Sequence, residues 1–239
     1  MSRGIIALCC LLVAAVGCVA PGRGARRARS APAPSAIVAA LARREQATRG
    51  LRLSMTVRLT GDDRASALPS PAYLAIDGTG AIRLQVLSAF GMTVLDLAIH
   101  GDAYTLALPL RHQTTDGRID LRALDDPAVA VSDRMIVALA LLFRPKARPA
   151  TCTGAEPWTV TCRVAPDLAA RLTVDDALRP VREEYRRDDG SPLLVATYDD
   201  YRGDDPAASP GSLRIADSAS GASMAIQVRR ARVVATSPS

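Results

Sequence analysis

The chain has 239 residues, of which 49% are hydrophobic and only 3% are aromatic, so it can bury a sizeable core built mostly from aliphatic side chains. The formal net charge of +6 is concentrated near the N-terminus: residues 18–49 contribute +6 and Arg3 one more, which leaves −1 from Gly50 onward. A near-neutral body argues against nucleic acid as a partner.

Residues 1–17 are predicted to be a secretory signal peptide. Arg3 supplies a positive charge, and the apolar run Ile5–Val16 that follows is shorter than the roughly 20 residues needed to span a bilayer. The sequence Ala-Val-Gly-Cys, ending at Cys18, resembles the lipobox of bacterial lipoproteins, in which the Cys thiol carries diacylglycerol and the finished anchor includes palmitate. We therefore expect lipidation at Cys18, with ordinary signal-peptidase cleavage after Ala20 as the alternative.

Residues 18–34 are rich in Pro, Gly, Ala and Arg and show no periodicity, which predicts a flexible linker. Next to a lipid anchor, its Arg side chains would lie against anionic headgroups, each contributing about 1 kcal/mol. A merely solvated linker is the alternative.

A helix is predicted from Ser35, acting as N-cap, to about Thr48, with Gly50 ending it. Its apolar stripe consists of Ile37, Val38, Leu41 and Ala42. Residues 51–60 then alternate strictly between apolar and polar side chains, which predicts a strand. Its apolar face consists of Leu51, Leu53, Met55, Val57 and Leu59.

Two further alternating runs predict a β-hairpin around residues 88–92. Ile82, Leu84 and Val86 share a face in the first run, and Leu95, Leu97 and Ile99 share a face in the second. Turns are usually polar, but this connection contains Phe90 and Met92. A local rule broken in this way indicates a functional loop. The alternative is that Phe90 folds back under a neighbouring strand or helix.

The flanking segments complete an antiparallel meander with one apolar face. Residues 73–76 are a predicted strand followed by an Asp77–Gly80 turn, and residues 103–108 follow a turn at 100–102. The pattern then weakens, and Thr115-Asp116-Gly117 is predicted to be a turn.

Residues 135–143 are almost entirely apolar and predict a helix buried on most sides, which would plug the open face of the sheet. Ser132 is its predicted N-cap, Asp133 suits its first turn, and Pro145 ends it. More strands are expected beyond it, at residues 152–164, 172–174, 181–185, 193–198, 213–215 and 224–228, with a loop at 204–210.

The cysteines fit an exported protein. Cys9 and Cys10 belong to the signal peptide and Cys18 to the anchor, which leaves Cys152 and Cys162 in an oxidising compartment. These two flank a predicted hairpin loop, and a disulfide between them would contribute roughly 3 kcal/mol. Two free thiols are the alternative.

Nothing in the sequence predicts an enzyme. It has no phosphate-binding glycine loop and no Gly-x-Ser-x-Gly motif. Its paired Asp residues mostly fall where turns are expected. Two cysteines and the distant His100 and His112 do not make a metal-ligand set. We therefore expect no catalytic residues, no metal and no cofactor.

The order of elements resembles the LolA/LolB lipoprotein-carrier superfamily over about residues 35–234. Leu-Ser-Ala-Phe-Gly-Met-Thr at 87–93 is similar to the strand, Pro-Leu-Gly, strand pattern of LolB-like lipoproteins, with Phe90 in the place of an exposed leucine and Ala89 in the place of the proline. Tyr-Asp-Asp-Tyr at 198–201, followed by Pro210 and Leu-Arg-Ile at 213–215, is similar to another family segment. Residues 135–143 fall where the family has a lid helix.

This resemblance implies a mainly β fold with α-helices: residues 35–239 would form a half-open antiparallel β-barrel lidded by helices. A LolB-like protein is anchored in the outer membrane facing the periplasm, receives lipoproteins from a LolA-like carrier, and needs a membrane-insertion loop, which here would be Phe90, Gly91 and Met92. The apolar cavity would take acyl chains of lipoproteins or lipids, lined by Leu53, Met55, Val57, Leu84, Val86, Leu95, Leu97, Leu106, Met135 and Leu139.

We expect a monomer in the bacterial cell envelope. The alternative is a non-transporting structural or scaffold lipoprotein, whose sheet would enclose a filled core rather than a cavity. A secreted hydrolase would need a polar constellation that the sequence does not show.

Overall fold

The computed structural model describes residues 30–61, 68–126, 128–148, 150–202 and 208–234. The predicted signal peptide, Cys18 and most of the predicted linker lie outside these residues. The chain divides into two units, residues 1–30 and residues 31–239, and the second unit contains the helices and strands. Within the described residues, neither helix is both long enough and apolar enough to cross a membrane.

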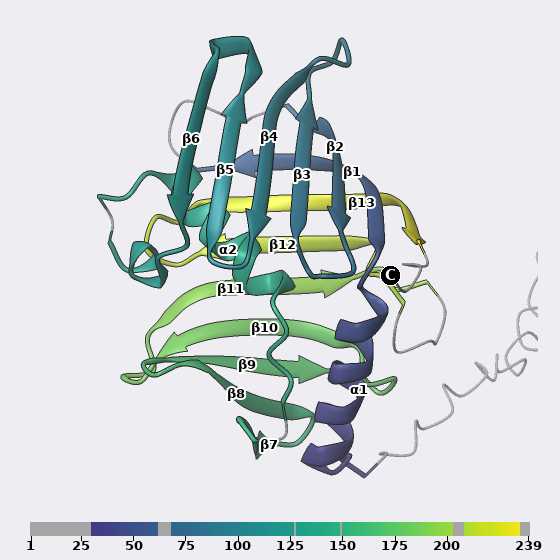
Figure 1. Ribbon diagram of the computed structural model, residues 1–239. Helices are drawn as coiled ribbons and strands as arrows, with labels where there is room; N and C mark the ends of the chain where they lie inside the picture. Colours follow the sequence, from purple (N-terminus) through teal and green to yellow (C-terminus); the bar gives the residue numbers. More distant parts are fainter. Residues whose placement is uncertain (1–29, 62–67, 127, 149, 203–207, 235–239) are drawn as a thin grey trace, which may run out of the picture. The chain divides into compact units, whose positions relative to one another are not determined.

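The body is one antiparallel sheet of 13 strands, ordered β6-β5-β4-β3-β2-β1-β13-β12-β11-β10-β9-β8-β7 (Figure 1). Because β6 and β7 are its two edges, the sheet stays open, which confirms the predicted half-open barrel. The strands are β1 (Leu51–Thr60), β2 (Ser70–Ile76), β3 (Ile82–Leu87), β4 (Thr93–His100), β5 (Ala103–Leu108), β6 (Gln113–Arg118), β7 (Cys152–Glu156), β8 (Thr159–Ala165), β9 (Leu168–Val174), β10 (Pro180–Arg187), β11 (Pro192–Asp199), β12 (Ser212–Asp217) and β13 (Ser223–Val233).

Strand β1 joins the two halves of this sheet. It pairs with β2 on one side and with β13 on the other, and its register with β13 shifts between Ser54 and Met55. Such a bulge bends a strand and increases its twist. In Figure 1 the strands β2–β6 run across the direction of β8–β13, so the interior faces of the two halves look onto the same space.

Helix α1 (Pro34–Ala47) starts two residues earlier than predicted, and Ser35 is not its N-cap. Ala33 occupies that position, without a side-chain cap, and Pro34 takes the first turn, where its fixed φ and missing N–H cost nothing. The predicted apolar stripe is confirmed, because Ile37, Val38 and Leu41 are buried.

Helix α2 (Val131–Phe143) is buried along almost its whole length, as predicted. Ser132 is not its N-cap either, since the helix begins at Val131 with Ala130 in the cap position and no side-chain cap. The predicted Asp133 does lie in the first turn. In Figure 1, α2 lies on the concave side of the sheet, as a plug of the open face should.

The predicted turn at Thr115–Gly117 is wrong, because these residues belong to β6. The chain reverses earlier, through the short helix η1 (Pro109–Arg111) and His112, whose φ of 52° is left-handed. Gly117 instead allows the Tyr104 ring to pack against the backbone of β6. A Cβ at residue 117 would lie 2.4 Å from Cζ of Tyr104 on the paired strand β5. A second short helix, η2 (Leu121–Leu124), leads toward α2.

The predicted hairpins are otherwise present, with strands longer than the alternation suggested. The strand predicted at residues 73–76 is part of the longer β2, the one at 172–174 is part of β9, and the one at 181–185 is part of β10. Of the loop predicted at 204–210, residues 204–207 lie outside the described residues, and 208–210 are not in a strand or helix.

Candidate functional site

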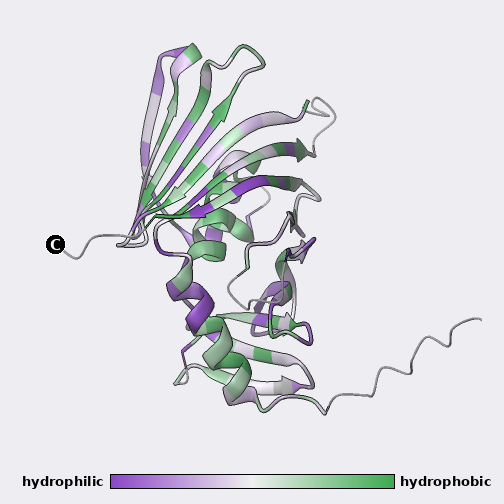
Figure 2. Cartoon of the chain, turned by 90° about the vertical axis from the view of Figure 1, so that its right-hand side faces the viewer, coloured by the Kyte–Doolittle hydropathy of each residue, from purple (hydrophilic) through white to green (hydrophobic). Residues whose placement is uncertain are grey.

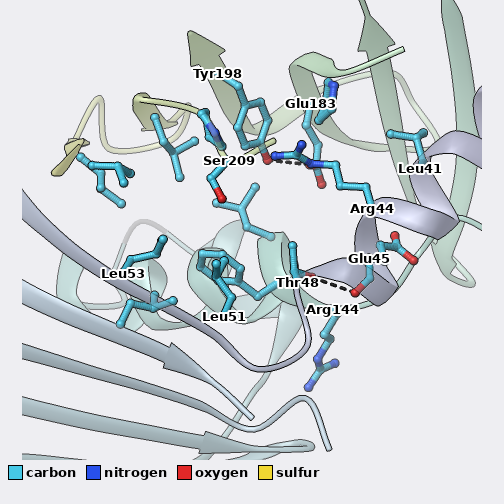
Figure 3. A pocket seen from close by; sticks show the side chains of 18 of the residues that line it. Leu41, Arg44, Glu45, Thr48, Leu51, Leu53, Arg144, Glu183, Tyr198 and Ser209 are labelled. Carbon is cyan, nitrogen blue, oxygen red and sulfur yellow. Dashed lines mark hydrogen bonds between the residues drawn. The ribbon is translucent and has the colours of Figure 1, made fainter. Parts of the chain in front are cut away.

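A cavity of about 120 Å³ lies between α1 and the inner face of the sheet. Its apolar wall comes from β1, β12 and β13, where strand alternation places every second side chain on the inner face. This wall includes Leu51, Leu53, Met55, Leu213, Ile226 and Val228. Figure 3 shows Leu51 and Leu53 on one side of this space, with Tyr198, Arg44 and Leu41 across from them.

Helix α1 covers the cavity with the side chains of its last turns. Leu41, Arg44 and Glu45 line it, together with Thr48, the C-cap residue that follows the helix. In Figure 2 this C-terminal part of α1 is the most hydrophilic stretch of the helix. The cover is therefore apolar at Leu41 and polar beyond it, so the cavity has one apolar wall and one mixed wall.

Two consecutive side chains hold this end of α1 in place. Arg44 donates a hydrogen bond to the Ala208 carbonyl and lies 5.3 Å from the centre of the Tyr201 ring. Glu45 Oε1 accepts hydrogen bonds from the backbone N–H groups of Lys146, at 2.9 Å, and Ala147, at 3.0 Å. The helix is thereby fastened to the segment after β11 and to the segment after α2.

A buried ion pair forms the polar side of the cavity. Nζ of Lys146 lies 2.7 Å from Oε1 of Glu183, and both side chains are buried. The same Nζ donates to the carbonyls of Leu141 and Leu142, at the end of α2 where carbonyls lack helical partners and a positive charge is favourable. The ammonium thus has three acceptors, which offsets its removal from water.

Tyr198 completes this polar group. Its hydroxyl donates a 2.8 Å hydrogen bond to Oε2 of Glu183. Burial, followed by the negative charge of Glu183, holds the pKa of Tyr198 well above its ordinary value. Tyr185, which is fully buried, donates to the Leu141 carbonyl, and burial likewise raises its pKa. Both tyrosines therefore stay neutral in the fold.

The arrangement can hold an apolar chain or an amphiphile. Each buried CH₂ contributes about 0.8 kcal/mol, and the apolar wall has no charge to exclude such a chain. At about 120 Å³ the cavity is smaller than the roughly 300–1,000 Å³ of ligand pockets, so a long chain requires α1 to shift. Among the described residues, no three His, Cys, Asp or Glu side chains are grouped to bind a metal ion.

The structure places two of the predicted lining residues, Leu53 and Met55, in the cavity wall. The other eight lie in the apolar core of the same domain: Val57, Leu84, Leu97, Met135 and Leu139 are buried, and Val86, Leu95 and Leu106 are partly buried against them. Contact between any of these residues and an acyl chain stays a prediction.

Sequence reasoning missed the polar side of the site. Glu183 had a signal, because it shares strand parity with Val181 and the buried Tyr185 and is therefore a carboxylate at an inward position. Lys146 and Arg44 had none, since nothing in their local sequence indicates a buried partner.

The loop at residues 88–92 is a hairpin tip away from the cavity lining. Ser88 organises it: its N–H donates to the Met92 carbonyl, and its Oγ accepts from the N–H groups of Phe90 and Met92. Phe90 is 89% exposed and Met92 51% exposed, so the alternative in which Phe90 folds back under its neighbours is wrong. Gly91 takes a left-handed φ of 78°.

The predicted disulfide between Cys152 and Cys162 is present. The two residues face each other across β7 and β8, so the bond fastens the edge strand β7 to its only neighbour in the sheet. The alternative of two free thiols is wrong for this structure.

Solved structures share this fold. A domain assigned to outer-membrane lipoprotein sorting, from Vibrio parahaemolyticus, matches with a TM-score of 0.55 at 13% identity, covering 82% of this chain and 90% of that one. A DUF1329 family protein from Desulfovibrio piger matches with a TM-score of 0.53 at 12% identity, covering 84% and 92%. A LolA superfamily protein from Nitrosomonas europaea matches with a TM-score of 0.51 at 11% identity, covering 87% and 96%.

At these identities the likeness establishes the fold alone, and that fold is the LolA-like half-open barrel expected from the sequence. No protein-family model matches the sequence. No curated protein matches it either.

Proposed function

We propose that this protein is a lipid-anchored, non-enzymatic binding protein of the bacterial cell envelope that holds acyl chains of lipoproteins or lipids. The observation that carries the proposal is the cavity between α1 and the sheet, with its apolar wall from β1, β12 and β13. The shared LolA-type fold supports it. So does the lipobox-like sequence at Cys18, which would anchor the chain to a membrane.

The finer proposal is a LolB-like role. The protein would receive lipoproteins from a LolA-like periplasmic carrier and insert them into the outer membrane, with Phe90, Gly91 and Met92 as the insertion loop. The exposed Phe90 ring supports this role, because a large apolar side chain held out at a hairpin tip fits a partner that is itself apolar.

The second candidate is a scaffold lipoprotein of the envelope that transports nothing. The observation that favours it is the small volume of the cavity beside a large packed core. The two candidates differ in whether α1 gives way to an acyl chain.

The LolB-like role is tested with Phe90→Glu. The anchored protein is loaded with a fluorescent triacylated-cysteine peptide, and transfer of the peptide to phosphatidylethanolamine–phosphatidylglycerol vesicles is followed. We expect transfer to fall at least tenfold while peptide loading and thermal stability stay unchanged, since a charge replaces the apolar ring at an exposed position.

His100→Glu is the matched control. His100 is an exposed residue at the end of β4 that lies away from the β3–β4 loop, so the same charge is added far from the tip. Transfer by this variant should equal that of the wild type. Equal transfer by Phe90→Glu and His100→Glu would refute the insertion role of Phe90.

A further inference from the structure

The connections at one end of strands β2–β6 carry exposed apolar side chains. In an antiparallel meander, the connections β1–β2, β3–β4 and β5–β6 fall at the same end. The described residues of these connections include Leu68, 84% exposed, Phe90, 89%, Met92, 51%, and Leu110, 56%. In Figure 1 the β3–β4 and β5–β6 tips stand next to each other at the top of the sheet.

The strand register places Leu68 at the same edge. Ala72 pairs with Val86, so the chain preceding Ser70 runs beyond β2 toward the level of the Phe90 tip. Residues 62–67 of this connection lie outside the described residues, and the inference uses Leu68 alone. The tips are thus three neighbouring apolar points rather than one.

The connections at the opposite end of the same strands are polar. Asp77 closes the β2–β3 turn by accepting hydrogen bonds from the backbone N–H groups of Thr79 and Ala81. The β4–β5 turn contains Gly101 and Asp102, which both accept from Arg144. The other exposed large apolar side chains lie in β1 and β2 or at the end of β13: Leu59, Tyr73, Val233 and Val234. Apolar hairpin tips therefore mark one end only.

The charge beside the β5–β6 tip suits a lipid surface. Arg111 directly follows Leu110 and is exposed, and the described residues of the β3–β4 and β5–β6 tips, 87–93 and 108–113, contain no carboxylate. The sequence of the β1–β2 connection includes Asp62, Asp63 and Arg64, so the cation that the inference uses is Arg111 alone. An apolar side chain next to an arginine is the combination that enters a headgroup region, with the apolar group inserted and the cation against lipid phosphate.

We propose that Leu68, Phe90, Met92 and Leu110 form one membrane-contact edge that docks the domain, through three adjacent tips, on an anionic bilayer surface. This goes beyond the proposed function, which uses the β3–β4 loop alone, and rests on it only in placing the protein beside a membrane. Docking on three points fixes the orientation of the sheet to the bilayer, which a single loop cannot do.

The edge is tested by depth-dependent fluorescence quenching. Leu68→Trp, Phe90→Trp and Leu110→Trp are each made in the full lipidated chain and placed in phosphatidylethanolamine–phosphatidylglycerol vesicles whose acyl chains are brominated. His100→Trp, at the other end of β4, is the matched control, and the wild type with its single Trp158 gives the background. We expect all three tip variants to be quenched at least twofold more than His100→Trp.

The proposed edge is wrong if Leu110→Trp and Leu68→Trp are quenched no more than His100→Trp. This holds even if Phe90→Trp is quenched, because the β3–β4 loop would then insert alone. Arg111→Glu in the Leu110→Trp background should reduce quenching, and an unchanged value contradicts the role of the charge. Binding of a fluorescent fatty acid by the same variants is measured separately. If the wild type does not bind the fatty acid, that result counts against the proposed cavity function and not against the membrane-contact edge.

Discussion

Glu183 is a carboxylate at an inward position of β10, and two partners make its burial tolerable. Lys146 supplies the opposite charge and Tyr198 a hydrogen-bond donor. Removing one partner of a buried charge is expensive, whereas the intact group is close to neutral in its effect on stability. The Tyr198 hydroxyl is therefore more important to the fold than its partly exposed ring suggests.

We expect Tyr198→Phe to lower the free energy of unfolding by about 1–3 kcal/mol at pH 7, because Oε2 of Glu183 loses its donor. The pKa of Tyr198 is raised in the fold, so its contribution is fully present below the unfolded pKa of about 10 and is lost as the pH rises above it. The variant should therefore lose stability less steeply than the wild type above pH 10.

The measurement is urea denaturation at pH 7 and at a series of values from pH 9 to pH 11. Tyr73→Phe is the control, since Tyr73 is half exposed on β2. It should follow the wild type throughout. A Tyr198→Phe curve that runs parallel to the wild type above pH 10 would show that Tyr198 does not titrate as the structure implies.

Single residues were predictable where the signal is local. Phe90 broke the rule for turn composition, and the structure exposes it. The buried pairs were not predictable, because Arg134 meets Asp217 and Lys146 meets Glu183 only after the sheet has brought distant segments together. An inward charge on a strand can be recognised from sequence, but its partner cannot.

At the scale of elements, α1 is the part of the site best placed to move. The first part of the helix packs through Ile37 and Val38, whereas its C-terminal end is held by polar contacts from Arg44 and Glu45. Polar contacts of this kind can be exchanged for contacts with water. A shift of this end alone would enlarge the cavity without unpacking the core.

We expect Glu45→Ala to loosen the end of α1, because the N–H groups of Lys146 and Ala147 lose their acceptor. Hydrogen exchange of residues 42–48 should accelerate at least threefold, and uptake of a fluorescent fatty acid should become faster. Arg43→Ala, at an exposed position of the same helix, should change neither. Faster hydrogen exchange with unchanged fatty-acid uptake would mean that movement of α1 does not control entry to the cavity.

Elements with strict alternation were predicted with their boundaries: β1 spans the expected residues 51–60. The boundary errors arose where a residue other than the predicted one started the helix or formed the turn. Pro34 started α1 without a cap from Ser35, and a left-handed His112 closed the β5–β6 connection before the predicted turn. Gly117 then served packing against Tyr104 rather than a reversal.

At the scale of the domain, the two halves of the sheet meet at β1 and β13, and the cavity lies where their inner faces converge under α1. The half-open barrel was predicted through the resemblance of the order of elements to the LolA/LolB superfamily. This resemblance could not predict the size of the cavity, because that depends on how closely side chains from β1, β12, β13 and α1 pack. The predicted lining accordingly included residues that lie in the core.

The central claim, that this cavity holds an acyl chain, is tested most directly by binding of a fluorescent palmitate analogue to Leu53→Trp. Leu53 lines the cavity, and Leu59, exposed near the end of the same strand, provides the matched control Leu59→Trp. We predict saturable one-to-one binding by the wild type and by Leu59→Trp, and at least tenfold weaker binding by Leu53→Trp, a loss of about 1.4 kcal/mol. Equal affinities of the two Trp variants, or no saturable binding by the wild type, would contradict the claim.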